Sequence, residues 1–266
     1  MERMKELIRL LNEAAKAYYQ ESREIMPNYE YDRLYDELEE LERKTGITLS
    51  NSPTIRVGYE VLSDLPKEKH PKKMLSLDKT KDVGALAAWL GSQEGVLSWK
   101  LDGLTIVLTY EEGKLAKAVT RGNGEIGEVI TSNARTFENL PLAIDFKGEL
   151  VLRGEAVISY ADFEKINDEI TDEGAKYKNP RNLCSGSVRQ LNNEITAKRN
   201  VRFYAIALVS AENIDFHNSR AGQFEWLKEQ GFDVVEYRVV TAGTLDKAMD
   251  YFSAAITEND FPSDGL

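Results

Sequence analysis

The stretch TIVLTYEEGKLAKAVTRG, residues 105–122, decides the fold class of this chain. Apolar side chains alternate with polar ones on either side of Glu112 and Gly113, a pattern typical of two half-buried strands joined by a tight turn. Strands joined by so short a turn pair antiparallel. The stretch therefore predicts a β-hairpin and, with it, an antiparallel sheet.

Further strands follow the hairpin. The segments LVLRGEAVI (150–158) and VRFYAIALV (201–209) are rich in β-branched and aromatic residues, which favour buried strands. Helical patterns interrupt them in YADFEKINDEI (160–170) and SRAGQFEWLKEQ (219–230). This order predicts an α+β domain built on antiparallel sheets with flanking helices.

The first 45 residues have a helical period instead, with one apolar stripe ending at Tyr18 and a second beginning at Tyr31. The connector RKTGITLSNSPTIRVG (43–58) carries turn residues and a proline, so the helical unit ends there, and residues 45–75 look irregular. We predict a small helical domain with its linker at 1–64 and the α+β domain at 65–266. The stripes consist of Leu7, Leu11, Ala14 and Tyr18, and of Tyr31, Leu34, Tyr35, Leu38 and Leu41.

Composition sets limits on the kind of protein. The 266 residues are 42% hydrophobic and 30% charged, as in a soluble globular protein. The single cysteine, Cys184, excludes a disulfide within the chain and a four-cysteine zinc site, and it suits a reducing cytoplasm. No apolar run approaches the roughly 20 residues that span a bilayer. We therefore expect a cytoplasmic protein without a membrane partner. We also expect a monomer, which composition does not decide.

The charge balance bears on nucleic-acid binding. Acidic residues outnumber basic ones by 45 to 34, which gives a net charge of −11. A protein that holds nucleic acid through bulk positive charge would be basic. Any contact with DNA must therefore come from local basic patches or from parts not present in this sequence.

Just before the hairpin, the run KLDG (100–103) places Lys100 among apolar residues. A lysine becomes a nucleophile when burial or neighbouring cations lower its pKa from about 10.4. Asp102 would point to the same side of a strand and could orient the amine or hold a metal, and Gly103 leaves room for a ligand. The alternative is a surface lysine whose apolar stem lies against its neighbours.

Six segments of the chain, in order, resemble the NAD-dependent DNA ligases of bacteria. KLDG resembles the family's nucleophile motif, and NPRNLCSGSVRQL (179–191) is the most specific match. The other four segments are SPTIRVG (52–58), MLSLDK (74–79) with His70 before it, TRGNGEIGEVITSNARTFENLPL (120–142) and LVLRGE (150–155).

The resemblance implies a fold and an activity. The fold is a helical domain that recognises nicotinamide mononucleotide (NMN), followed by an ATP-grasp-like, DNA-ligase nucleotidyltransferase domain. The activity is that of a DNA ligase (NAD+) in DNA replication and repair. Lys100 would attack NAD to form lysyl-AMP and release NMN. This is the first step in sealing a nick between a 5′-phosphate and a 3′-hydroxyl in duplex DNA.

The resemblance also assigns roles around the nucleophile. Ser76 and Leu77 would border the adenine. Asp102 and Glu155 would bind the cofactor, with Glu155 on the ribose, and both could help to place magnesium, a cation that prefers oxygen ligands. The guanidinium groups that would bind the phosphates belong to Arg121, Arg181 and Arg189.

The helical domain decides the cofactor, because ATP-dependent ligases, RNA ligases and capping enzymes lack it. Tyr18 and Tyr31 could stack on the nicotinamide ring. Asp32 could bond the ribose or balance the positive charge of the ring. The alternative for the tyrosines is packing between two helices, which we prefer for Tyr35.

Four positions depart from the family's pattern. Ser98 stands where an acid usually reads the adenine amine, and Ile206 stands where an aromatic stacks on adenine. Asn123 and Asn28 each replace an aspartate. The sequence ends at FPSDGL (261–266), before a further strand lysine. We therefore expect an N-terminal piece of a longer ligase, with its nucleotidyltransferase domain truncated, that reaches nicked DNA only through the complete enzyme.

Two other functions remain open at this point. The first is a nucleotide-binding scaffold without chemistry, which the changes at Ser98 and Ile206 favour. The second is an ATP-dependent nucleotidyltransferase of the RNA-repair or capping type, because the KLDG chemistry is common to these enzymes.

Overall fold

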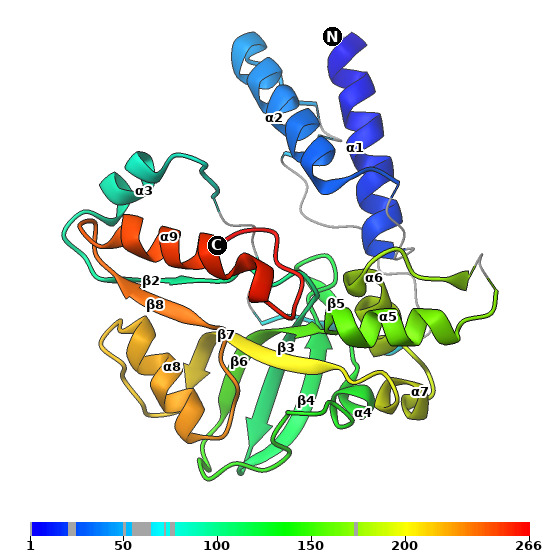
Figure 1. Cartoon of the computed structure of the whole chain (residues 1–266), viewed down its shortest axis with the longest axis vertical. Helices are drawn as coiled ribbons and strands as arrows, with labels where there is room; N and C mark the ends of the chain where they lie inside the picture. The colour runs from blue at the N-terminus through cyan, green and yellow to red at the C-terminus, as the bar shows by residue number, and fades with distance from the viewer. Residues whose placement is uncertain are drawn as a thin grey trace. The chain divides into compact units, whose positions relative to one another are not determined.

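The computed structural model describes residues 2–20, 25–49, 52–54, 65–71, 73–74, 78–172 and 175–266. The chain divides into two compact units. Unit 1 comprises Met1–Ser76 and Arg121–Glu128, and unit 2 comprises Leu77–Thr120 and Val129–Leu266. Figure 1 shows the helices of unit 1 in blue and the sheets and helices of unit 2 in colours from cyan to red.

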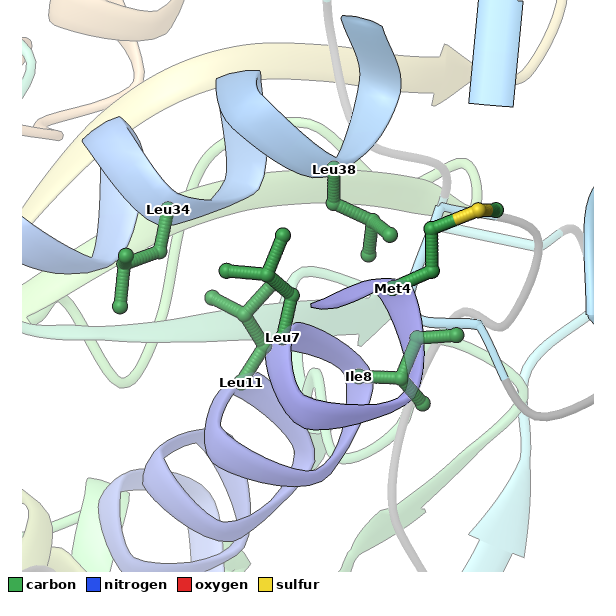
Figure 2. Close-up of a cluster of buried hydrophobic side chains, with 6 residues drawn as sticks. All are labelled: Met4, Leu7, Ile8, Leu11, Leu34 and Leu38. Atoms are coloured by element: carbon green, nitrogen blue, oxygen red, sulfur yellow. The ribbon is translucent and has the colours of Figure 1, made fainter. Parts of the chain in front are cut away.

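Two helices form the core of unit 1, α1 (Glu2–Gln20) and α2 (Asn28–Thr45). The predicted helical period is confirmed, because leucines of both predicted stripes are buried in one cluster, drawn in Figure 2. Gly46 ends α2 in the left-handed conformation, with φ of 67°, and its N–H donates to the carbonyl of Glu42. The cluster consists of Met4, Leu7, Ile8, Leu11, Leu34 and Leu38.

A small sheet completes unit 1. Strand β1 (Lys67–Lys69) pairs antiparallel with β5 (Ile126–Glu128). The expectation that residues 45–75 are irregular was wrong at β1, because Lys-Glu-Lys has no apolar alternation and becomes a strand only by pairing with a distant segment. In the turn that precedes β5, the side chain of Asn123 accepts hydrogen bonds from the N–H groups of Glu125 and Ile126 at 2.9 and 2.8 Å.

The main sheet of unit 2 has the strand order β4-β3-β6-β7, with every neighbouring pair antiparallel. The predicted hairpin is confirmed, because the strands on either side of Glu112 and Gly113 pair with each other. Both turn residues have positive φ, 52° and 75°, as a tight hairpin turn requires. The strands are β3 (Leu104–Glu111), β4 (Lys114–Thr120), β6 (Leu150–Val157) and β7 (Arg202–Ala211).

A second, two-stranded sheet pairs β2 (Gly95–Ser98) antiparallel with β8 (Tyr237–Val240). The helices predicted around residues 160–170 and 219–230 are present as α5 and α8, so the α+β class is confirmed. The helices of unit 2 are α3 (Val83–Leu90), α4 (Thr131–Ala134), α5 (Tyr160–Glu169), α6 (Pro180–Val188), α7 (Asn193–Ala197), α8 (Arg220–Glu229), α9 (Leu245–Ala255) and the 3₁₀ turn Ile256–Glu258.

Helix α6 packs against β3 and β6 and brings a functional segment onto the main sheet. Asn179 caps its N-terminus by accepting a hydrogen bond from the N–H of Asn182 at 2.8 Å, and Pro180 occupies the first turn. Within the described residues, no helix combines the length and the apolarity needed to cross a membrane.

Candidate active site

Lys100 lies just beyond the end of β2. Its N–H donates to the carbonyl of Gly265 at 2.9 Å, and the N–H of Asp102 donates to the carbonyl of Pro262 at 2.8 Å. The last residues of the chain therefore pair with the KLDG run. The side-chain amine of Lys100 forms an ion pair with the carboxylate of Asp264.

The burial expected for Lys100 is not found. Its side chain is 61% exposed, because β2 ends at Ser98 and the amine points away from the packed core. Trp99, its neighbour, is 6% exposed and takes the inward position instead. The amine is thus accessible to a ligand, and the carboxylate of Asp264 rather than an apolar wall surrounds it.

Asp102 and Arg181 join the KLDG run to helix α6. The guanidinium Nη1 of Arg181 lies 2.6 Å from Oδ1 of Asp102, and the two side chains are only 19% and 16% exposed. The cap at Asn179 sets the start of α6 and hence the position of Arg181. Two predicted site residues that lie 79 positions apart in the sequence therefore meet.

Glu155 occupies β6 with its carboxyl group buried. Its Oε1 accepts a hydrogen bond from the N–H of Gly103 at 3.1 Å. Burial raises the pKa of Glu155 to about 7, although the nearby Arg181 guanidinium opposes the shift. The carboxyl group therefore exists in both protonation states near neutral pH, and it can donate to a hydroxyl as well as accept from one.

Gly103 is required by this arrangement. A Cβ at this position would lie 2.0 Å from the carbonyl oxygen of Ala156 on β6. The loop therefore approaches the strand more closely than any side chain permits, and this approach places the N–H of Gly103 against Glu155.

Arg189 ends α6, and its Nη1 donates to the hydroxyl of Ser185 at 2.7 Å. Asn133, which the sequence reasoning missed, supports this end of the helix. Its side-chain amide donates to the carbonyls of Val188, at 2.5 Å, and Gln190, at 2.8 Å. An asparagine in the run TSNAR gave no sign of this role, because both acceptors lie more than 50 residues away.

Cys184 lies in the middle of α6 and is fully buried. Its Sγ donates to the carbonyl of Ala156 at 3.1 Å. Burial raises the pKa of the thiol, so Cys184 is a packing residue beside the site and not a nucleophile.

Other predicted residues belong to unit 1. Nη2 of Arg121 donates to the carbonyl of Met74 at 3.3 Å, and the ring of His70 bonds the carbonyl of Arg121 at 3.1 Å. Tyr31 and Asp32 lie in the first part of α2, where the Tyr31 ring stacks on Tyr35 with centroids 6.3 Å apart.

For three of the predicted site residues, the structure describes no side chain. Ser76 and Leu77 lie outside the described residues, and Tyr18 is placed in α1 by its backbone alone. The roles of all three stay predictions.

Magnesium can be tested against the donors that are present. No group of three or more His, Cys, Asp or Glu side chains in the described parts of the chain could hold a metal. Asp102 and Glu155 are two oxygen donors, and one of them is already paired with Arg181. Magnesium usually takes one or two carboxylates and completes its shell with water and substrate phosphates. The pair therefore fits an ion that arrives with phosphate and does not form a cage by itself.

The KLDG run thus joins the exposed amine of Lys100, the Asp102–Arg181 pair and the bond from Gly103 to the buried Glu155 on a domain of antiparallel sheets. This is the class of domain, a nucleotidyltransferase, that the resemblance implies. Residues 62–266 match the family model of the NAD-dependent DNA ligase adenylation domain, and residues 1–58 match that of the DNA ligase-like, N-terminal NAD+-binding domain. The chain therefore belongs to the NAD-dependent DNA ligase family.

Individual relatives agree with the family match. The chain is 66% identical over 263 residues to a DNA ligase of Ruminiclostridium cellulolyticum, covering 99% of this chain and 40% of that protein. It is 64% identical over 265 residues to one of Lachnoclostridium phytofermentans, covering 100% of this chain and 41% of that protein. A DNA ligase of Sulfurovum sp. is 37% identical over 265 residues, which cover 96% of this chain and 40% of the relative. The chain thus spans about two fifths of the length of these relatives.

Proposed function

We propose that this chain carries out the adenylation half-reaction of an NAD-dependent DNA ligase, with Lys100 as the nucleophile. One observation carries the proposal. The exposed amine of Lys100 lies on the same short run as Asp102, which pairs with Arg181, and Gly103, which bonds Glu155. This cluster lies inside the region that matches the adenylation domain.

In the proposed step, the amine of Lys100 loses a proton and its nitrogen forms a bond to the adenylyl phosphorus of NAD. The bond from that phosphorus to the bridging oxygen breaks, and NMN leaves with the electron pair. Asp264 contacts the amine and is placed to accept its proton. The guanidinium groups of Arg181 and Arg189 would offset the negative charge that develops on the phosphate.

The remaining residues would bind the cofactor. Glu155 would bond the ribose hydroxyls as donor or acceptor, since its pKa is about 7. Arg121, Ser76 and Leu77 would contact the phosphate and the adenine. On the helical unit, Tyr18, Tyr31 and Asp32 would hold the nicotinamide half.

The proposed reaction also involves magnesium and, in the complete ligase, nicked duplex DNA. Asp102 and Glu155 would hold magnesium bound to the NAD pyrophosphate, and the ion would supply positive charge toward the phosphate. The nicked duplex DNA would be a substrate of the complete ligase, with this chain supplying the adenylate. We further propose that the chain acts as a monomer in the cytoplasm, with 1–64 as its NMN-recognition domain and 65–266 as its nucleotidyltransferase domain.

Incubation with NAD or ATP labelled in the adenylate tests this proposal. Covalent label from NAD alone, lost in Lys100→Ala and retained in the matched exposed variant Lys114→Ala, is the expected result. Label from ATP would support the capping-type alternative. Absence of label from both nucleotides, in the presence of magnesium, would support a scaffold without chemistry and overturn the proposal.

A further inference from the structure

Helix α6 carries three polar side chains in one row. Arg181, Ser185 and Arg189 follow one another at intervals of four residues, so they lie on the same face of the helix about one turn apart. Arg181, at the start of the row, pairs with Asp102 of the KLDG run. Ser185 therefore stands between two of the arginines that are proposed to bind phosphate.

The hydroxyl of Ser185 contacts the side chain of Arg189 directly. Nη1 of Arg189 donates to Oγ of Ser185 at 2.7 Å, which is at the short end of the range for N–H···O bonds. Ser185 is 6% exposed, so little water competes for this acceptor. The bond turns the guanidinium of Arg189 back along α6, toward the end of the helix that carries Arg181 and meets the KLDG run.

A different residue fixes the backbone at Arg189. The buried side-chain amide of Asn133 donates to the carbonyls of Val188 and Gln190, one on either side of the arginine. These bonds hold the two peptide groups that flank Arg189. The freedom that remains at Arg189 is in its long side chain, and the bond to Ser185 restricts that freedom.

Arg189 lies near the other charged groups of the candidate site. Burial raises the pKa of the Cys184 thiol, and two acids and two arginines act on this pKa as well. Electrostatic interactions weaken with distance, so these four groups lie around one buried atom of α6. They are Glu155, Arg181, Arg189 and Asp102.

We propose that Ser185 is a positioning residue for adenylation, whose hydroxyl holds the guanidinium of Arg189 where it can offset charge on the adenylyl phosphate. The proposal rests on the adenylation function proposed above. A free arginine side chain adopts many rotamers, and only some of them would bring the guanidinium to the phosphate. A side chain that is held beforehand loses less entropy in the transition state, so the hydroxyl raises the rate without touching the substrate.

Single-turnover adenylation of the whole chain, with NAD and magnesium, tests this role. Ser185→Ala should lower the rate at saturating NAD at least about fivefold, because Arg189 loses the acceptor that orients it. The NAD concentration at half the maximal rate should change less than about twofold, since the guanidinium acts mainly on charge that develops in the transition state.

Ser187→Ala is the matched control for Ser185→Ala. Ser187 is also buried on α6, but its hydroxyl donates to the carbonyl of Leu183, one turn back along the helix. The control should leave the adenylation rate unchanged. A wild-type rate in Ser185→Ala would overturn the proposal.

A double-mutant cycle separates positioning from a general effect on the helix. In an Arg189→Ala background, Ser185→Ala should slow adenylation less than about twofold, because the side chain that Ser185 orients is gone. A serine that only stabilised α6 would slow the reaction equally in both backgrounds, and that result would also overturn the proposal.

NMR distinguishes failure of this proposal from failure of the proposed function. The heteronuclear NOE of the Arg189 Nε–H group, assigned with Arg189→Lys, reports how rigidly the side chain is held. It should fall in Ser185→Ala and keep its wild-type value in Ser187→Ala. If it falls but the wild type forms no covalent AMP from NAD, the adenylation function is wrong and the orientation of Arg189 by Ser185 stands. An unchanged NOE in Ser185→Ala would show that the hydroxyl does not hold the guanidinium.

Discussion

The amine of Lys100 and the carboxylate of Asp264 form an ion pair across 164 positions of sequence. The backbone holds the two residues together independently, because the N–H of Asp264 donates to the carbonyl of Lys100 at 3.1 Å. A carboxylate therefore contacts the amine of the proposed nucleophile and is placed to accept its proton in the proposed attack on NAD.

Replacing Asp264 by Asn should slow adenylation at least about tenfold, because the amine loses its nearest proton acceptor. The free energy of unfolding should change by less than about 1 kcal/mol, since both side chains are partly exposed and the pair is screened. Single-turnover adenylation with NAD and urea unfolding measure the two effects. The exposed acid Asp250 on α9 provides the control Asp250→Asn. Equal rates in both variants would remove Asp264 from the mechanism.

Lys100→Ala should abolish covalent AMP while leaving the fold intact. The phosphoramide needs an amine, and the exposed side chain contributes little to packing. Intact-protein mass spectrometry detects the adduct, and the unfolding midpoint reports on the fold. A mass increase of one AMP in the variant would contradict the assignment of the nucleophile.

Glu155→Gln should change how stability depends on pH. The pKa of Glu155 rises from 4.5 to about 7 on folding, so the carboxyl is neutral in both states at pH 4. As the pH rises from 4.5 to 7, the unfolded chain loses this proton while the folded chain retains it, and stability falls. Glu155→Gln should remove this loss, which is on the order of 3 kcal/mol above pH 7.

Urea unfolding at pH 4 and pH 8 measures this difference between wild type and Glu155→Gln. The variant should gain stability relative to wild type only at the higher pH. Glu149→Gln, an exposed residue just before β6, is the control and should show no such gain. A constant difference at both pH values would show that the buried carboxyl is not responsible.

Gly103→Ala should destabilise unit 2 by at least about 2 kcal/mol. The added methyl group would lie 2.0 Å from the carbonyl oxygen of Ala156, and strand β6 cannot move away without losing its pairing. Gly243→Ala is the control, since its Cβ would find only Thr241 Oγ1, at 4.0 Å. Denaturant unfolding compares them, and similar midpoints would contradict the close approach at Gly103.

Asp32→Asn should raise the KM for NAD about five- to tenfold and change kcat little, because it removes the charge that we propose to lie opposite the cationic nicotinamide ring. The substitution keeps the shape of the side chain. Asp36→Asn, one turn further along α2 and exposed, is the matched control. If both variants have the wild-type KM, the contact with nicotinamide is not made by Asp32.

The sequence predicted those parts of the fold that local pattern decides. The hairpin at Glu112 and Gly113 could be predicted because alternation and turn chemistry coincide there. The helical core could be predicted because its apolar residues recur with a period near 3.6. Strand β1 could not, because Lys67–Lys69 has no pattern of its own and is a strand only through its partner β5.

For the candidate site, the sequence indicated which residues to consider but not how they are arranged. Resemblance to a family named Asp102, Glu155 and Arg181, and the structure brings these three together. The exposure of Lys100 could not be predicted, since it depends on where β2 ends and which neighbour turns inward. The hydrogen bonds from Asn133 to the end of α6 could not be predicted either, because the two acceptor carbonyls lie on a segment that only the folded chain brings near.

The alkylation rate of the buried thiol of Cys184 can report on local opening of the protein near the candidate site. Cys184 carries the single thiol of the chain, and α6 holds it against the carbonyl of Ala156, where no reagent in solution can reach it. Its rate of alkylation therefore records how often α6 lifts from β6. Because Arg181 and Arg189 stand on the same helix, a ligand that binds them should retard alkylation. The occupancy of the site can thus be inferred from the alkylation rate of the natural sequence, without an introduced reporter group.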